Sequence, residues 1–436
     1  MDKLGKLVYS KPELLYYYKG LVEVPTLQMV DDILCIQKCS PQTVQLNSVV
    51  NTFMELEKLQ LNQKKCHKIH IGKNSSCCQD LKIHGQPMKE ATSDTYLGDK
   101  IHNSGNNKAN IETRAAKGFG KVKTILAMLK EAPLGKARVQ AGMILREAML
   151  LNGILYNSEA WHGITTADVA VLERVDEALL RGVVGGHSKL PLTALYLECG
   201  AVPIRFILMS RRIIYLQAIL KRDDSELLKK LYEAQKVNKT KGDFADLVTQ
   251  DLHKLEIKEN EEAIKNMTKV CLQKLVKTQV KEAALKYLMS NKTSKTSKLN
   301  YKKLELQQYL KSPSFSEKES NLLLALRTRT VRGIRADFPG MFTTRECPMQ
   351  GCMEEDTLPH LLTCTVLLSQ VEEQQHSYRF SDVYSDCLEE QLRITKRLAL
   401  LLEARERVER EGLPATQIAG SPAPVDTAVC NVIHYV

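Results

Sequence analysis

The spacing of apolar residues over positions 1–105 predicts short strands around one long helix. Ser40 and Pro41 begin the helical segment, because a capping residue followed by proline at the first helical position is typical of a helix N-terminus. Its apolar residues recur at helical spacing, namely Val49, Val50, Phe53, Met54, Leu56 and Leu59. The β-rich runs lie at 26–30, 33–37, 66–71, 80–84 and 95–101. We therefore expect an α+β region here.

From about residue 106 onward the pattern predicts helices. Long amphipathic segments with Gly and Pro breaks extend to about Leu220, and more polar helical sequence continues to about Asn300. Ser316 and Glu319 have the spacing of a capping box at the start of another helix. A last helix is expected over 366–411, and the Pro, Gly and Ala residues of 412–436 predict a disordered tail.

Charge favours a polyanionic partner such as nucleic acid. The chain has a net charge of +11 and a pI of about 8.9. Nine Lys or Arg stand against two Glu between Lys108 and Arg146, and ten Lys against two Glu between Lys274 and Lys311. We expect Lys117, Lys121 and Lys123 of the first segment to contact phosphates. The alternative is that these lysines only form solvated helix faces.

The cysteines and the apolar runs indicate an intracellular protein, nuclear or cytoplasmic. The residues after Met1 lack the apolar core of a secretion signal, and no apolar run approaches the length of a membrane span. We therefore expect neither secretion nor a membrane partner. The twelve cysteines are then expected to be reduced, and a clustered subset favours metal binding over cross-linking.

Two adjacent acids, Asp31 and Asp32, lie between apolar segments with the character of strands. A β-hairpin would place both carboxylates at its turn while its arms enter a core. Adjacent carboxylates repel each other unless a cation neutralises them, and Mg²⁺ is the natural partner in phosphoryl-transfer sites. An Asp-Asp pair in an ordinary turn is the alternative, because such pairs are common by chance.

The context of the two aspartates resembles the polymerase of non-LTR (LINE-type) retrotransposons. The segment 29–34, Met-Val-Asp-Asp-Ile-Leu, resembles the catalytic hairpin motif of reverse transcriptases. The segment 61–66, Leu-Asn-Gln-Lys-Lys-Cys, is similar to the following palm motif, and Tyr96-Leu97-Gly98 is similar to the primer grip. The three motifs follow one another in the order of the family.

The resemblance implies a role for each matching position. Asp31 would bind both Mg²⁺ ions of a two-metal nucleotidyl transfer, and Asp32 would support it. Lys65 would lie near the triphosphate of the incoming dNTP; as an alternative it is a solvated lysine at a strand edge. Tyr96, Leu97 and Gly98 would place the primer 3′ end, and their alternative is an ordinary strand end.

The family also uses another metal-binding Asp in a motif well upstream of the hairpin. Only 30 residues precede Asp31, and the earlier acids Asp2, Glu13 and Glu23 do not lie in such a motif. Two dications and a triphosphate need carboxylates from both places. We therefore expect this polypeptide not to polymerise by itself.

A cluster of soft ligands occurs near the C-terminus. Cys347, Cys352, His360 and Cys364 follow the spacing Cys-x4-Cys-x7-His-x3-Cys, which suits a tetrahedral and structural Zn²⁺ site. Incidental Cys and His residues in a loop are the alternative. The spacing resembles the CCHC zinc knuckle that follows the polymerase in many non-LTR elements, although the Cys-x4-Cys arm is longer than in the commonest variants.

These observations predict an α+β chain with a partial reverse transcriptase palm, made of a short antiparallel sheet and a helix, over 1–105. A helical thumb (106–222), a basic helical connector (223–335) and a zinc knuckle with a terminal helix (336–411) would follow. The expected partner is an RNA or DNA template–primer. The alternative function is a non-catalytic protein that binds nucleic acid through the thumb and the knuckle.

Overall fold

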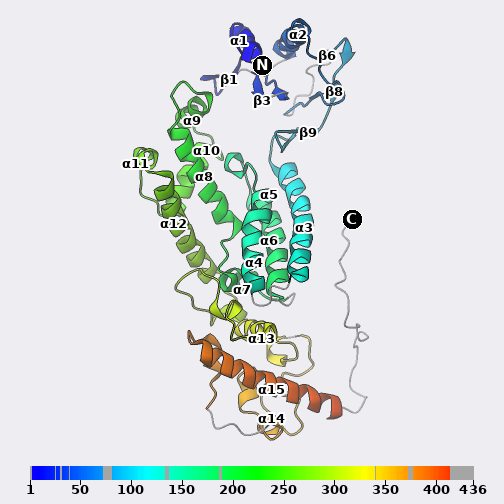
Figure 1. The fold of residues 1–436 in the computed structure, drawn as a ribbon, viewed down its shortest axis with the longest axis vertical. Helices are drawn as coiled ribbons and strands as arrows, with labels where there is room; N and C mark the ends of the chain where they lie inside the picture. The colour runs from blue at the N-terminus through cyan, green and yellow to red at the C-terminus, as the bar shows by residue number, and fades with distance from the viewer. Residues whose placement is uncertain are drawn as a thin grey trace. The chain divides into compact units, whose positions relative to one another are not determined.

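The structure is a computed structural model in which the chain forms two compact units, Met1–Thr328 and Arg329–Val436 (Figure 1). It is an α+β protein dominated by helices. The expected boundary between connector and knuckle, at 335/336, lies close to the division between the units. The structure describes residues 2–24, 26–29, 32–38, 40–71, 81–132, 137–185, 189–338, 340–371 and 377–412. All of the predicted tail except Gly412 lies outside these residues.

The first hundred residues combine short helices with small β-pairs. Helices α1 (Asp2–Tyr9), η1 (Pro12–Leu14) and α2 (Ser40–Leu56) pack on one another. Their core consists of apolar side chains with exposed fractions of 0–8%, namely Leu4, Val8, Leu15, Leu46, Val50, Phe53 and Met54. The predicted start of α2 at Ser40 is confirmed. Helix α1 was not predicted.

The described strands form five two-stranded sheets and not one sheet. Four pairs are antiparallel: β1 (Tyr16–Tyr18) with β2 (Val22–Val24), β3 (Leu27–Met29) with β4 (Asp32–Leu34), β6 (Lys82–Ile83) with β7 (Gln86–Pro87), and β9 (Ser93–Tyr96) with β10 (Asp99–His102). The fifth pair, β5 (His67–Lys68) with β8 (Lys89–Glu90), is parallel. Two of the hairpins, β3–β4 and β9–β10, contain the predicted site residues.

A helical bundle follows the β9–β10 hairpin. Its elements are α3 (Lys108–Glu131), α4 (Arg138–Leu145), the π-helix η3 (Arg146–Leu151), α5 (Asn152–Ile154), η4 (Ser158–Ala160), α6 (Thr166–Val184), α7 (Leu192–Cys199) and α8 (Ile204–Leu220). Helix α3 packs on α6 and α6 on α8 (Figure 1). Inside the bundle, the buried Arg146 guanidinium donates to both carboxylate oxygens of Asp176, at 2.6 and 2.7 Å. This ion pair joins η3 to α6.

More helices complete the first unit. They are α9 (Leu227–Val237), α10 (Phe244–Lys254), α11 (Glu261–Asn266), α12 (Lys269–Ser290), η5 (Ser294–Thr296), η6 (Gln308–Leu310) and α13 (Glu317–Arg327). The capping box of Ser316 and Glu319 is confirmed at the start of α13. Arg327 at the end of α13 donates to the buried Glu198 of α7 at 2.9 Å, and Tyr301 and Tyr309 donate to the same carboxylate. This cluster fastens the connector to the bundle.

The second unit contains η7 (Arg335–Asp337), η8 (His360–Leu362), α14 (Thr365–Leu368), η9 (Phe380–Tyr384) and α15 (Leu388–Gly412). Helix α15 packs against η8, α14 and η9. The prediction of one helix over 366–411 is wrong, because α14 ends at Leu368 and α15 begins at Leu388. Before this new start the Ser385 hydroxyl accepts the Cys387 N–H at 3.0 Å, which forms a turn that leads into α15.

No single described helix is long and apolar enough to cross a membrane, and the bent pair α7 and α8 meets that test only when its two members are joined across a 55° bend.

Candidate metal centre and nucleic-acid surface

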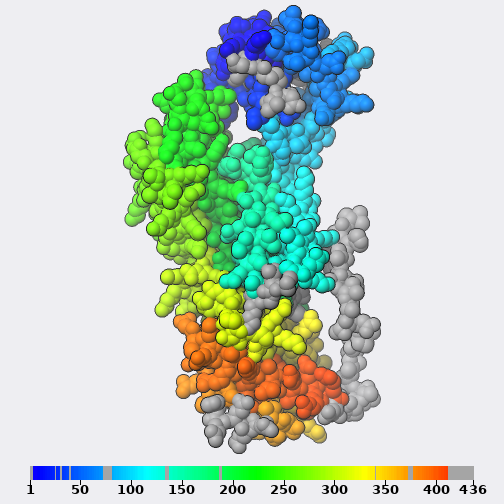
Figure 2. All heavy atoms as spheres, in the orientation of Figure 1, coloured from blue at the N-terminus to red at the C-terminus, as the bar shows by residue number. Residues whose placement is uncertain are grey.

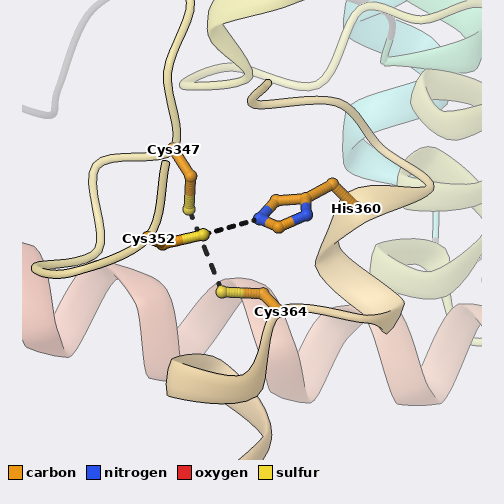
Figure 3. Close-up of side chains that lie close together, drawn as sticks. All are labelled: Cys347, Cys352, His360 and Cys364. Carbon is orange, nitrogen blue, oxygen red and sulfur yellow. Dashed lines mark hydrogen bonds between the residues drawn. The ribbon is translucent and has the colours of Figure 1, made fainter. Parts of the chain in front are cut away.

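The four predicted zinc ligands lie together in the second unit (Figure 3). Their ligand atoms are all within 4.8 Å of one another. The sulfurs of Cys347 and Cys364 are 3.9 Å apart, and the Cys352 sulfur is 3.4 Å from Nε2 of His360. A tetrahedron with Zn–S bonds of about 2.3 Å and Zn–N bonds of about 2.0 Å has edges of roughly 3.8 and 3.5 Å. The cluster therefore has the size of a tetrahedral zinc site.

Local backbone structure explains why these side chains converge. The Cys347 N–H donates to the Glu354 carbonyl at 2.8 Å, which closes the loop that holds both of the first two cysteines. Gly351 takes a φ of +84° at the turn of this loop, a conformation that favours glycine. The Cys364 N–H donates to the His360 carbonyl at 2.8 Å, so one helical turn places the last two ligands on the same side.

Burial shapes the chemistry of the cluster. The side chains of Cys347 and Cys364 are buried, and His360 is nearly so. Burial raises the pKa of the Cys347 thiol to about 12, while the Met349 N–H acts in the opposite direction. A dication reverses this preference for the neutral thiol, because thiolates are the form that binds metal. Three sulfurs and one imidazole select Zn²⁺, and four protein ligands leave no position for a substrate.

Sequence reasoning missed Asp356, which lies between the second and third ligands. Its side chain is fully buried, and its backbone N–H donates to the Arg345 carbonyl at 2.7 Å. One carboxylate oxygen accepts the Arg335 N–H at 2.7 Å. Asp356 thus connects the ligand loop to η7.

The predicted carboxylate hairpin is present in the described strands. Strands β3 and β4 are antiparallel, and Met29 pairs with Asp32, so two residues connect them. Asp31 is one of these two and lies outside the described residues. Asp32 is exposed at the first position of β4. It belongs to no group of three or more potential metal ligands among the described residues, which do not include Asp31.

Tyr96 lies beside this hairpin although 64 residues separate it from Asp32. Its hydroxyl donates to the Leu27 carbonyl of β3 at 3.3 Å. Burial raises the pKa of Tyr96, and the negative charge of Asp32 raises it further. Leu97 and Gly98 form the turn of the β9–β10 hairpin with φ values of +47° and +83°. The first and third motifs are therefore adjacent in space.

The lysines named from the sequence have different environments. Lys65 is exposed at the last position of the turn at 62–65, where its N–H donates to the Asn62 carbonyl at 2.9 Å. Lys117 and Lys123 are exposed on α3, which reaches the surface of the first unit along its cyan side (Figure 2). Lys121 is half-buried and its ammonium donates to the Met149 carbonyl at 3.2 Å. The ammonium of Lys121 therefore already has a partner in the bundle, unlike that of a freely solvated lysine.

Charge is divided unequally between the two units. Residues 1–328 contain 51 Lys and Arg against 35 Asp and Glu, a net charge of +16. Residues 329–436 contain 11 Lys and Arg against 16 Asp and Glu, a net charge of −5. Electrostatic attraction of a polyanion is therefore stronger for the first unit than for the second.

The chain matches no family model, and no curated protein or solved structure is significantly similar to it.

Proposed function

We propose that the chain is a fragment of a non-LTR retrotransposon reverse transcriptase, which binds template–primer nucleic acid through residues 1–328. The contact between Tyr96 and Leu27 carries this proposal. Through this contact Tyr96, at the end of the strand before the primer-grip-like turn, lies beside the β3–β4 hairpin. Such proximity is necessary if the turn is to hold a primer 3′ end while the aspartates of the hairpin act on it. A chance resemblance of the two motifs would not require them to meet.

Nucleotidyl transfer by this chain alone is not part of the proposal. Two-metal transfer needs several oxygen ligands around two dications and a triphosphate. Among the described residues, no group of potential metal ligands contains Asp32. The proposal therefore includes no catalytic step that uses Mg²⁺. Binding of dNTP would then require further carboxylate ligands beside Asp31 and Asp32.

The Cys347–Cys364 cluster would act as a structural zinc knuckle. Its closed ligand set supports this role, because it has no free position for a reactive water. The ion would hold the ligand loop against α15, and the net charge of −5 argues against a large contribution of this unit to phosphate binding.

A primer extension assay tests the proposal. The purified chain, labelled primer–template, dNTPs and Mg²⁺ should give a stable complex but no extension above an Asp31→Ala control. Asp31-dependent synthesis would show that the chain completes its own site. Absence of binding at about 50 mM salt would contradict the proposal, because phosphate contacts are strongest at low salt.

A second candidate is a non-catalytic nucleic-acid-binding protein, favoured by the charge of +16 on residues 1–328. The two candidates differ in what Tyr96 does. A primer grip binds a recessed primer 3′ end more tightly than a blunt duplex, and Tyr96→Ala removes that preference. Equal affinity for both ends would favour the second candidate.

A further inference from the structure

A network of buried and half-buried polar side chains joins the β9–β10 turn to helix α3. The carboxylate of Asp99, the first residue of β10, accepts three hydrogen bonds. The Arg114 guanidinium donates at 2.6 Å, the Asn110 amide at 2.9 Å and the Asn157 amide at 2.8 Å. Asn110 in turn accepts the Lys100 N–H at 3.2 Å. The turn and the helix are thus fixed to each other on both sides of Asp99.

Arg114 is the centre of this network. Its guanidinium also donates to the Gly98 carbonyl at 3.0 Å and to the Gly153 carbonyl at 3.4 Å. It lies 5.2 Å from the ring centroid of Tyr156, and its side chain is 8% exposed. Because Arg114 is nearly buried, it cannot itself bind the phosphates of a nucleic acid in solution. The planar guanidinium has several N–H donors, so it can donate to one carboxylate and two carbonyls at the same time. The single ammonium group of a lysine cannot reproduce this arrangement.

Lys117 lies three residues after Arg114 on α3, and residues three apart are neighbours on a helix surface. Both lie on the flank of α3 to which the turn is fastened. Lys123 is also exposed on α3 but, at 100° per residue, lies about 120° around the helix from Lys117. The two lysines therefore form a matched pair, of which only Lys117 is next to the network.

We propose that Arg114, with Asp99, is a positioning residue that holds the Leu97–Gly98 turn and Lys117 as one phosphate-binding surface for duplex nucleic acid. The inference rests on the proposed function. Arg114 itself contacts no ligand in this role. It fixes the distance between the Leu97–Gly98 turn and α3, both of which must contact the same nucleic-acid strand. Without Arg114, Lys117 is no longer held at a fixed distance from the turn.

The test measures the affinity of the full chain for a labelled primer–template as a function of salt. The slope of log K against log salt changes by about 0.9 for each phosphate that a variant no longer neutralises. Lys117→Gln and Lys123→Gln are each introduced into the wild-type chain and into Arg114→Lys. Asp99→Asn provides a second background that weakens the network without removing the guanidinium. Helical circular dichroism and its thermal unfolding transition check that each variant is folded.

The expected result is a shallower slope for both substitutions in the wild-type chain. In the two network variants, Lys117→Gln should have no further effect, whereas Lys123→Gln should still reduce the slope. An equal effect of Lys117→Gln in all three backgrounds would overturn the inference and leave the proposed function intact. Failure of the wild-type chain to bind duplex would overturn both.

Discussion

Arg405 of α15 donates two hydrogen bonds to the buried carboxylate of Asp356, at 2.7 and 2.8 Å. The same guanidinium donates to the Gly333 carbonyl at 2.7 Å. Asp356 lies inside the ligand loop, so α15 holds the metal-binding segment by an ion pair. The zinc cluster and α15 therefore form one folding unit, unlike a knuckle that folds by itself around its ion.

Removal of one partner of this pair should weaken both folding and metal binding. Asp356→Ala leaves the buried guanidinium of Arg405 with Glu409 as its remaining carboxylate partner, and removal of one member of a buried ion pair costs about 3–5 kcal/mol. Zinc affinity should fall as well, because metal binding and folding are coupled in small sites. Chemical denaturation and zinc competition titration measure the two effects. Glu406→Ala, which breaks an exposed pair with Arg410, is the control and should change neither.

The cluster should bind one Zn²⁺ per chain. Cys364→Ser removes a buried ligand and should abolish stoichiometric zinc in elemental analysis, with loss of helical signal, because metal binding and folding are coupled in small sites. Cys387→Ser changes an exposed cysteine of the same unit and should retain the ion. Zinc retention by Cys364→Ser would remove the cluster from consideration as a metal centre.

The exposed lysines of α3 should contribute to salt-dependent binding. Substitution of both Lys117 and Lys123 with Glu should weaken duplex binding and flatten its salt slope by about 0.9 for each phosphate that is no longer neutralised. Thermal stability should change little, because both positions are exposed. Lys318→Glu on α13 makes the same change of charge at one exposed position elsewhere in the first unit and serves as the control for each single substitution. Unchanged affinity of the double variant would show that these lysines only form a solvated helix face and do not contact phosphates.

Gly200 should tolerate no side chain. Its φ is +61°, and an added Cβ would overlap the backbone of Glu305 and Leu306, which cannot move away as a flexible side chain can. Gly200→Ala should therefore lower the unfolding temperature far more than Gly20→Ala, where φ is +74° but the space is open. The control costs only the left-handed conformation, about 1–2 kcal/mol. An equal fall in unfolding temperature for both variants would show that the backbone at Glu305 and Leu306 moves aside without a loss of stability.

Local signals in the sequence were sufficient for several elements. The capping box of Ser316 and Glu319, the Ser40–Pro41 start and the helical turn from His360 to Cys364 each depend on residues close together in the chain. Short-range hydrogen bonds and turn preferences determine such features, so their spacing predicts them. The size of the zinc cluster follows from the same local rules.

Long-range partners were not predictable in this way. Arg405 and Asp356 are 49 residues apart, and nothing beside either residue in the sequence indicates the other. Lys121 was grouped with Lys117 because both lie in one basic run, but only the packing of α3 on the rest of the bundle brings its ammonium to the Met149 carbonyl. Tertiary packing, and not composition, decides which of several lysines remains available to solvent.

The two units have net charges of opposite sign, so positive charge predominates in residues 1–328 and negative charge in residues 329–436. A long polyanion attracted to residues 1–328 is repelled by residues 329–436, and both effects strengthen as salt falls and the screening length grows beyond about 10 Å. A molecule occupied by nucleic acid would thus keep the surface of its zinc unit clear of phosphates.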